Sequence, residues 1–232
     1  LLVEQIFSFF PAGGPDLLHL LTKPAVDLCQ LGFFLLPLLP LVGGVPAGET
    51  LFIVVTGGDD SPGKSTVAVN IAQALLPIGL TAVFDADPRV PNARYYLGLP
   101  SWNYLSPVTA GDSAAPGTQT KQGLVVADWS SGADGAEAVL REQPVVRAEC
   151  ADGSPRPLEY AVVDVPCRAR GLLETACGRT SSVVVVARTE RSGFENAFVA
   201  LKSLREAAPG RKAGLVVNGA PGEAYSRAFH AK

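Results

Sequence analysis

One glycine-rich stretch, residues 58–65, has the residue types and spacing for a defined chemistry. It reads Gly-Asp-Asp-Ser-Pro-Gly-Lys-Ser and fits the phosphate-loop pattern G-x-x-x-x-G-K-[ST]. In this pattern the backbone N–H groups of the loop, here from Gly58 to Gly63, surround the phosphates of a nucleotide. Lys64 reaches the β- and γ-phosphates, and the Ser65 hydroxyl ligates Mg²⁺. We call residues 58–65 the phosphate loop, and they predict a nucleotide site.

The neighbours of the phosphate loop favour the same interpretation. An apolar, β-branched run, Leu51–Thr56, precedes the loop and predicts a strand, and Lys64–Leu76 predicts the helix that follows. The positive end of a helix dipole attracts anions, so strand, loop and helix start together form an anion site. An ordinary glycine turn is the alternative, because the chain has 24 glycines. The strand–loop–helix order favours the nucleotide site.

Acidic residues follow two other predicted strands. Asp85 and Asp87 lie at and just beyond the end of one strand, and Asp164 ends another. Open α/β sheets bind ligands at the carboxyl ends of their strands, and Mg²⁺ takes few protein ligands. With Ser65, these acids could supply the metal site and the group that orients a nucleophile. The alternative is that Asp85 and Asp87 only cap the turn before Pro88.

From residue 48 onward, apolar segments alternate with amphipathic ones, which predicts a parallel sheet with crossover helices. We expect a doubly wound, mostly parallel sheet in a three-layer α/β/α fold, and two loops, Ser106–Thr120 and Ala151–Pro157. The predicted strands are Leu51–Thr56, Thr81–Asp85, Leu124–Ala127, Tyr160–Asp164, Ser182–Ala187 and Gly214–Asn218, and the predicted helices are Lys64–Leu76, Ala133–Arg141 and Phe194–Ala207.

Residues 1–48 differ in composition from the nucleotide-binding domain predicted over residues 49–232. Residues 28–48 carry no charge, and about 20 apolar residues can span a bilayer. Pro37 and Pro40 interrupt the run, and no Lys/Arg cluster flanks it. We expect an apolar docking segment, packed on the domain or a partner subunit, with membrane contact as the alternative. The expected location is the cytoplasm or the inner face of the membrane.

The overall charge argues against nucleic acid as a partner. The net charge is −3 and the isoelectric point is about 5.4, so no global basic field attracts a polyanion. The four cysteines show no C-x-x-C spacing, which argues against a zinc or iron–sulfur site and favours reduced thiols.

Five motifs follow one another along the chain. They are Gly63–Leu75 at the loop and first helix, Ala82–Arg89 around the aspartate pair, Asp87–Asn92 with Leu97–Pro100, Leu105 and Ala110-Gly111, then Leu158–Pro166, and last Leu215–Asn218. In this order they resemble the motifs of the MinD/ParA/Mrp class of P-loop ATPases, with Ala82–Arg89 as the second aspartate motif, Leu158–Pro166 as the Walker B strand and Leu215–Asn218 as a late strand. Within the class, the residues around 87–111 most resemble the bacterial tyrosine kinase domains of capsule and exopolysaccharide export. The resemblance covers about residues 48 to 221.

The resemblance implies a role for each matching residue. Lys64, Ser65 and Thr66 would hold the phosphates and Mg²⁺, and Asp87 would position the nucleophile. Asp85 and Asp164 would support the metal, and Asn218 would contact the adenine. The implied ligands are ATP and Mg²⁺, and the implied active form is a homo-oligomer or a subunit of a larger assembly. Arg168 and Arg170 follow the Walker B strand, where this class has a switch region.

Departures from the class leave three functions open. Asp59 replaces a lysine that MinD-like ATPases carry at the start of the loop, Asp60 follows it, and Pro62 removes one N–H donor. The first hypothesis is an ATPase or tyrosine-kinase-like phosphotransferase of an envelope-associated or exopolysaccharide assembly. The alternatives are a degenerate P-loop subunit with a structural or regulatory role, and a ParA/MinD-like positioning ATPase. Only Tyr225 lies near the end of this sequence, where the kinases carry a tyrosine-rich tail, so we expect no such tail here.

Overall fold

The computed structural model describes residues 49–58, 63–87, 92–99, 108–110, 113–115, 117–128, 146–149, 153–188, 190–211 and 213–218. A seven-stranded sheet dominates these residues, with the strand order β11-β10-β1-β9-β2-β6-β5. All of its strand pairs are parallel except β5 with β6. Its strands are β1 (Leu51–Gly57), β2 (Thr81–Asp85), β5 (Gly117–Gln119), β6 (Val125–Asp128), β9 (Tyr160–Asp164), β10 (Thr180–Arg188) and β11 (Ala213–Asn218).

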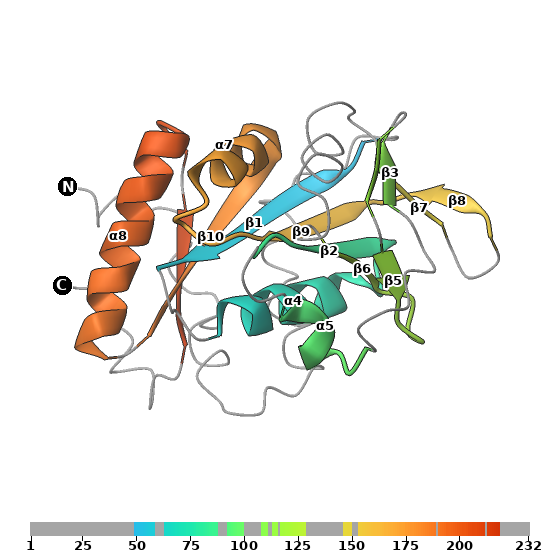
Figure 1. Ribbon diagram of the computed structural model, residues 1–232, viewed down its shortest axis with the longest axis horizontal. Helices are drawn as coiled ribbons and strands as arrows, with labels where there is room; N and C mark the ends of the chain where they lie inside the picture. The colour runs from blue at the N-terminus through green and yellow to red at the C-terminus, as the bar shows by residue number, and fades with distance from the viewer. Residues whose placement is uncertain are drawn as a thin grey trace, which may run out of the picture.

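Helices cover both faces of this sheet (Figure 1). One face packs against α4 (Lys64–Leu75), with the short α5 (Ala93–Tyr96) beside it. The other face packs against α7 (Arg170–Arg179) and α8 (Arg191–Ala207). A buried apolar cluster lies on each side of the sheet, which confirms the predicted three-layer, doubly wound architecture.

The apolar runs explain why the central strands form. Residues of β1, β9 and β10 are buried on both faces, as expected for parallel strands between two helix layers. All six predicted strands are present, and the predicted helices at Lys64–Leu76 and Phe194–Ala207 correspond to α4 and α8. Helix α8 begins three residues earlier than predicted, at Arg191.

Both predicted loops contain strands, so those two predictions are wrong. Within Ser106–Thr120 lie β3 (Val108–Ala110), β4 (Ser113–Ala115) and β5, and within Ala151–Pro157 lies β8 (Pro155–Pro157). Strands β3, β4 and β8 join β7 (Arg147–Glu149) in a small antiparallel sheet with the order β4-β3-β7-β8. Strand β5 instead extends the main sheet. Neighbouring segments pair in β3 with β4, β5 with β6 and β7 with β8, and only β3 with β7 joins distant parts of the chain. Prolines are tolerated in β8 because it is an edge strand.

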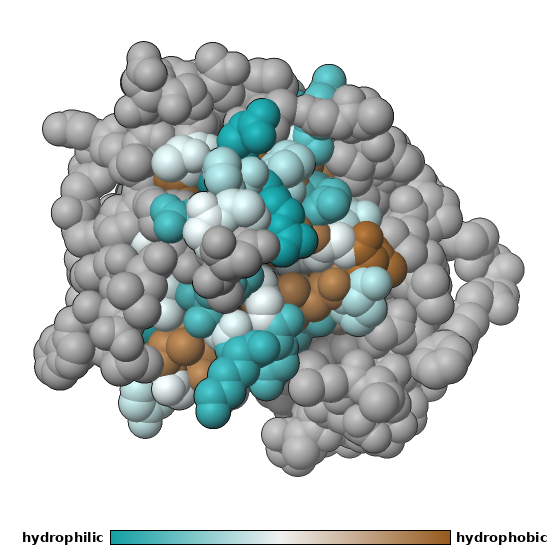
Figure 2. Space-filling view, turned by 90° about the vertical axis from the view of Figure 1, so that its right-hand side faces the viewer, coloured by the Kyte–Doolittle hydropathy of each residue, from teal (hydrophilic) through white to brown (hydrophobic). Residues whose placement is uncertain are grey.

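Some predictions lie outside the described residues, namely the segment at residues 1–48, the helix at Ala133–Arg141, and residues 59–62 of the phosphate loop. Among the described residues, no helix has both the length and the apolar character needed to cross a membrane. On the face in Figure 2, the described residues mix hydrophilic and hydrophobic side chains.

Candidate nucleotide-binding site

The phosphate loop ends where α4 begins, directly after the central strand β1. Helix α4 starts at Lys64, Gly63 is its N-cap, and no side chain caps the helix. No acidic residue lies in its first turn. The first N–H groups of a helix have no partner within the helix, so the amides of Lys64, Ser65 and Thr66 are donors for an anion.

Gly63 has a backbone conformation that other residues rarely adopt. Its φ is 102°, in the left-handed region. A Cβ at this position would overlap the side-chain amide of Asn218, which ends β11. Gly63 therefore turns the chain into α4 against the side chain of Asn218. This places Asn218 beside the loop, and its contact with a base stays a prediction.

Replacing Gly63 by alanine should destabilise the protein for two separable reasons. Gly210 also has a positive φ, 81°, but a Cβ there would meet nothing within 4 Å. Gly210→Ala therefore measures backbone strain alone, about 1 kcal/mol. Gly63→Ala adds the overlap with Asn218 and should cost at least about twice as much free energy of unfolding. Urea unfolding of both variants measures the difference, and equal losses would mean that Asn218 does not restrict Gly63.

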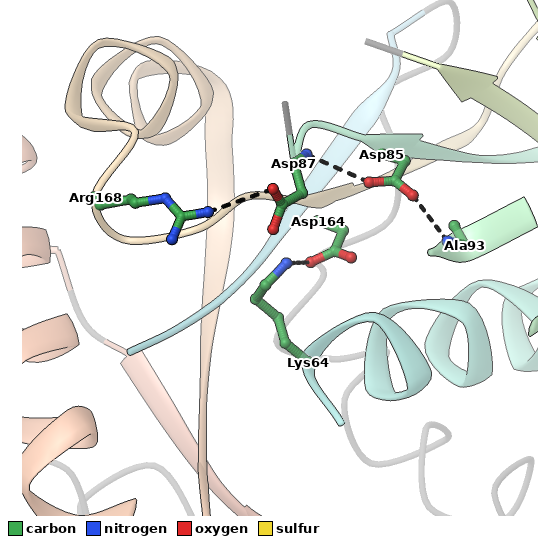
Figure 3. Close-up of polar contacts among 6 residues, drawn as sticks. All are labelled: Lys64, Asp85, Asp87, Ala93, Asp164 and Arg168. Atoms are coloured by element: carbon green, nitrogen blue, oxygen red, sulfur yellow. Dashed lines mark hydrogen bonds and ion pairs between the residues drawn. The ribbon is translucent and has the colours of Figure 1, made fainter. Parts of the chain in front are cut away.

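Lys64 and Asp164 form a buried ion pair at the centre of the site (Figure 3). Lys64 Nζ donates to Asp164 Oδ1 from the first residue of α4 to the last residue of β9. The Lys64 side chain is 9% exposed and that of Asp164 is fully buried. The second oxygen, Asp164 Oδ2, is buried and has no hydrogen-bond partner among the described residues. A buried carboxylate oxygen without a donor is suited to a cation or a bound water.

Asp85 lies beside Asp164 on the neighbouring strand. The two residues are register partners of β2 and β9, so their side chains project from the same face of the sheet. Two residues earlier in each strand, Val83 and Val162 belong to the apolar cluster under α4, which identifies that face. Asp85 Oδ2 accepts a hydrogen bond from Ala93 N at 2.8 Å and Oδ1 accepts one from Asp87 N at 3.3 Å.

These surroundings raise the pKa of Asp85 to about 7 from 3.8. Burial is the largest cause, and the negative charge of Asp164 adds to it. The hydrogen bonds from Ala93 and Asp87 and the charge of Lys64 lower the pKa in part. Asp85 therefore carries only part of its negative charge near neutral pH and also ties β2 to the start of α5.

Asp87 lies two residues beyond Asp85 and pairs with Arg168. Arg168 Nη2 is 3.5 Å from Asp87 Oδ1, and Figure 3 shows the two side chains pointing toward each other. Arg168 lies in the turn between β9 and α7, four residues after Asp164. The structure thus brings Lys64, Asp85, Asp87 and Asp164 to one edge of the sheet, and their roles in chemistry stay predictions.

The residues at this edge fit a magnesium ion held together with a nucleotide. Ser65 and Asp164 offer the oxygen ligands that Mg²⁺ prefers, and Asp164 Oδ2 has no other described partner. Both oxygens of Asp85 already accept backbone hydrogen bonds, so its support for a metal would be indirect. Among the described residues, no three His, Cys, Asp or Glu side chains converge on one point. Phosphate oxygens and water would complete the coordination of the ion.

Two neighbours of the site were missed in the sequence. Asp128 ends β6 in register with Asp85, and it follows an apolar strand in the same way as Asp85 and Asp164, a signal that could have identified it. Asn196 of α8 lies against Gly58, where a Cβ would overlap it. No sequence pattern joins α8 to the phosphate loop, because tertiary packing alone sets that contact.

Solved structures share this architecture at low sequence identity. A plasmid partition protein of Borrelia burgdorferi, bound to AMPPNP, is 12% identical with a TM-score of 0.55, over 79% of this chain and 80% of that one. MinD in the MinC:MinD complex of Aquifex aeolicus is 19% identical with a TM-score of 0.51, over 72% and 68%. The kinase domain of the Escherichia coli tyrosine kinase ETK is 15% identical with a TM-score of 0.53, over 93% and 86%.

These matches confirm that the chain has the MinD/ParA-class P-loop fold, which the bacterial tyrosine kinase domains share. No family model matches the chain. Among curated proteins, the flagellum site-determining protein YlxH of Helicobacter pylori is 23% identical over 158 residues, which are 67% of this chain. The chain spans about half the length of that relative, 54%.

Proposed function

We propose that the chain binds Mg·ATP at the phosphate loop and either hydrolyses it or transfers its γ-phosphate to a hydroxyl. The observation that carries this proposal is the meeting of Lys64, at the start of α4, with Asp164, at the end of β9. A phosphate-loop lysine and a strand-end aspartate must lie together for this chemistry. Binding of AMPPNP by the partition protein supports ATP as the nucleotide.

Each residue of the site has a defined task in this proposal. The amides of residues 64–66 and Lys64 Nζ bind phosphate oxygens. Asn218, beside the phosphate loop, contacts the adenine base. Ser65 and Asp164 would hold Mg²⁺, which when bound offsets charge on the β- and γ-phosphates. Asp87 orients the attacking water or hydroxyl and accepts its proton.

Turnover of Asp87→Asn tests this chemistry. The unchanged chain should release phosphate from Mg·ATP, and EDTA should abolish the release. Asp87→Asn should lower the turnover number by about 100-fold, because the asparagine amide cannot accept the proton. Its dissociation constant for Mg·ATP should change less than about threefold. Glu174→Gln, on the exposed face of α7, is the control and should keep normal turnover. Normal turnover in Asp87→Asn would contradict the assigned role.

The same assay separates the other candidate functions. Binding without turnover in the unchanged chain would support a degenerate P-loop subunit, for which Asp59, Asp60 and Pro62 argue. Phosphotyrosine on an added acceptor would support the kinase-like reaction, and with it an envelope-associated or exopolysaccharide assembly. Phosphate release alone would support a positioning ATPase, which fits the relative from Helicobacter pylori, a flagellum site-determining protein. We also propose that the chain acts with a partner subunit, in the cytoplasm or at the inner face of the membrane.

A further inference from the structure

Arg168, like Lys64, forms an ion pair with an acidic residue of the candidate site. Its guanidinium contacts Asp87 at 3.5 Å across 81 positions of the sequence. The side chains are 26% and 16% exposed, so solvent screens this pair less than a pair on the open surface.

Backbone hydrogen bonds hold the chain on both sides of Arg168, and one of them reaches the sheet. Ala169 N donates to Pro166 O at 3.0 Å and closes the turn, and Leu173 N donates to Ala169 O at 2.9 Å where α7 starts. Cys167 N donates to Gly57 O at 3.4 Å, at the last residue of β1. Arg168 therefore projects from a turn that is anchored directly beside the phosphate loop.

The backbone around Asp87 is fixed by the two other acids of the site. Ala86 N donates to Asp164 O at 2.9 Å, and Asp87 N donates to Asp85 Oδ1 at 3.3 Å. These bonds set the position of the Asp87 backbone. The contact with Arg168 Nη2 supplies a direction for the carboxylate (Figure 3).

We propose that Arg168 is a positioning residue for Asp87, a role that rests on the proposed phosphoryl chemistry. Three acids, Asp85, Asp87 and Asp164, lie at this edge of the sheet, and Lys64 already pairs with Asp164. A guanidinium keeps its charge at all physiological pH values and binds carboxylates directionally. Arg168 thus holds the Asp87 carboxylate in one orientation and offsets its charge when a polyphosphate enters.

Turnover of Arg168 variants tests the proposal. Arg168→Gln should lower the turnover number by about tenfold, because a misdirected Asp87 loses its alignment, and should change the dissociation constant for Mg·ATP less than about threefold. Arg168→Lys should lose less, since it keeps the charge without the planar fork. In Asp87→Asn, adding Arg168→Gln should cause little further loss. The control is Arg170→Gln, which removes the same charge two residues away, from exposed pairs with Glu174 and Glu206.

Unfolding without nucleotide tests the contact independently of activity. In urea, the combined variant Arg168→Gln/Asp87→Asn should lose less of its unfolding midpoint than the sum of the two single losses, because both remove one interaction. Additive losses of the unfolding midpoint would overturn the proposal. Normal or increased turnover in Arg168→Gln would also overturn it, and so would equal falls of the turnover number in Arg168→Gln and Arg170→Gln. If the unchanged chain binds no Mg·ATP, the proposed function itself fails. That failure can be told apart from failure of the positioning proposal, because the unfolding measurements would still report the contact between Arg168 and Asp87.

Discussion

Lys64→Ala should lose both nucleotide affinity and stability. In the nucleotide-free protein the substitution leaves the fully buried Asp164 without its cation, and breaking a buried pair in this way costs about 3–5 kcal/mol of the free energy of unfolding. The variant also lacks a charge-assisted bond to phosphate, worth about 1.5–3 kcal/mol. We therefore expect the dissociation constant for Mg·ATP to rise by about 100-fold.

Urea unfolding and calorimetric titration measure the two losses separately. Lys202→Ala on α8 is the matched control, since it removes an exposed lysine and should change neither quantity. If Lys64→Ala folds too poorly for titration, Lys64→Gln retains a donor for Asp164 and should show the affinity loss with a smaller change in stability. Unchanged affinity in a folded Lys64 variant would contradict a role for this lysine in phosphate binding.

Stability should fall as the pH rises from about 4 to about 7, through the titration of Asp85. The carboxyl has a pKa of about 7 in the folded protein and 3.8 as its ordinary value. Between these values the folded state holds a proton that the unfolded state has released, so the free energy of unfolding decreases with pH and levels off above about pH 7. The shift corresponds to a loss of at most about 4 kcal/mol.

Other carboxyl groups also titrate in this range, so a difference between variants is the useful measurement. Asp85→Asn removes the titrating group, and its oxygen can still accept from Ala93 N. The stability of the unchanged chain relative to Asp85→Asn should therefore decline between pH 4 and pH 7. Glu195→Gln, an exposed position of α8, should show no such relative decline. Parallel pH profiles for the unchanged chain and Asp85→Asn would show that the pKa of Asp85 is ordinary in solution.

The central layer could be predicted from the sequence because its signals are local. Strand β1, the glycine spacing and the start of α4 are adjacent along the chain, and the continuous apolar run of β10 indicates a strand buried on both faces. Aspartates at the ends of β2 and β9 could be placed together since parallel strands share one carboxyl edge. For this reason the sequence predicts that Lys64, Asp85 and Asp164 form one site.

The rest depended on contacts that no local pattern encodes. Helix α7 was missed because Gly171 and Gly178 lower its helix propensity, and its stability comes from burying residues such as Leu173 against the sheet. The short strands β3 to β5 have little apolar alternation, so only pairing reveals them. The orientation of Arg168 toward Asp87 follows from the β9–α7 turn, which a linear motif does not describe.

A crystal structure of this chain with Mg·AMPPNP would test the central claim most directly. We expect the triphosphate over the amides of residues 63–66, with Lys64 Nζ on a phosphate oxygen instead of Asp164, and the metal near Ser65 and Asp164. A nucleotide bound elsewhere, or a Lys64–Asp164 pair that persists at saturating nucleotide beside an empty phosphate loop, would contradict the account.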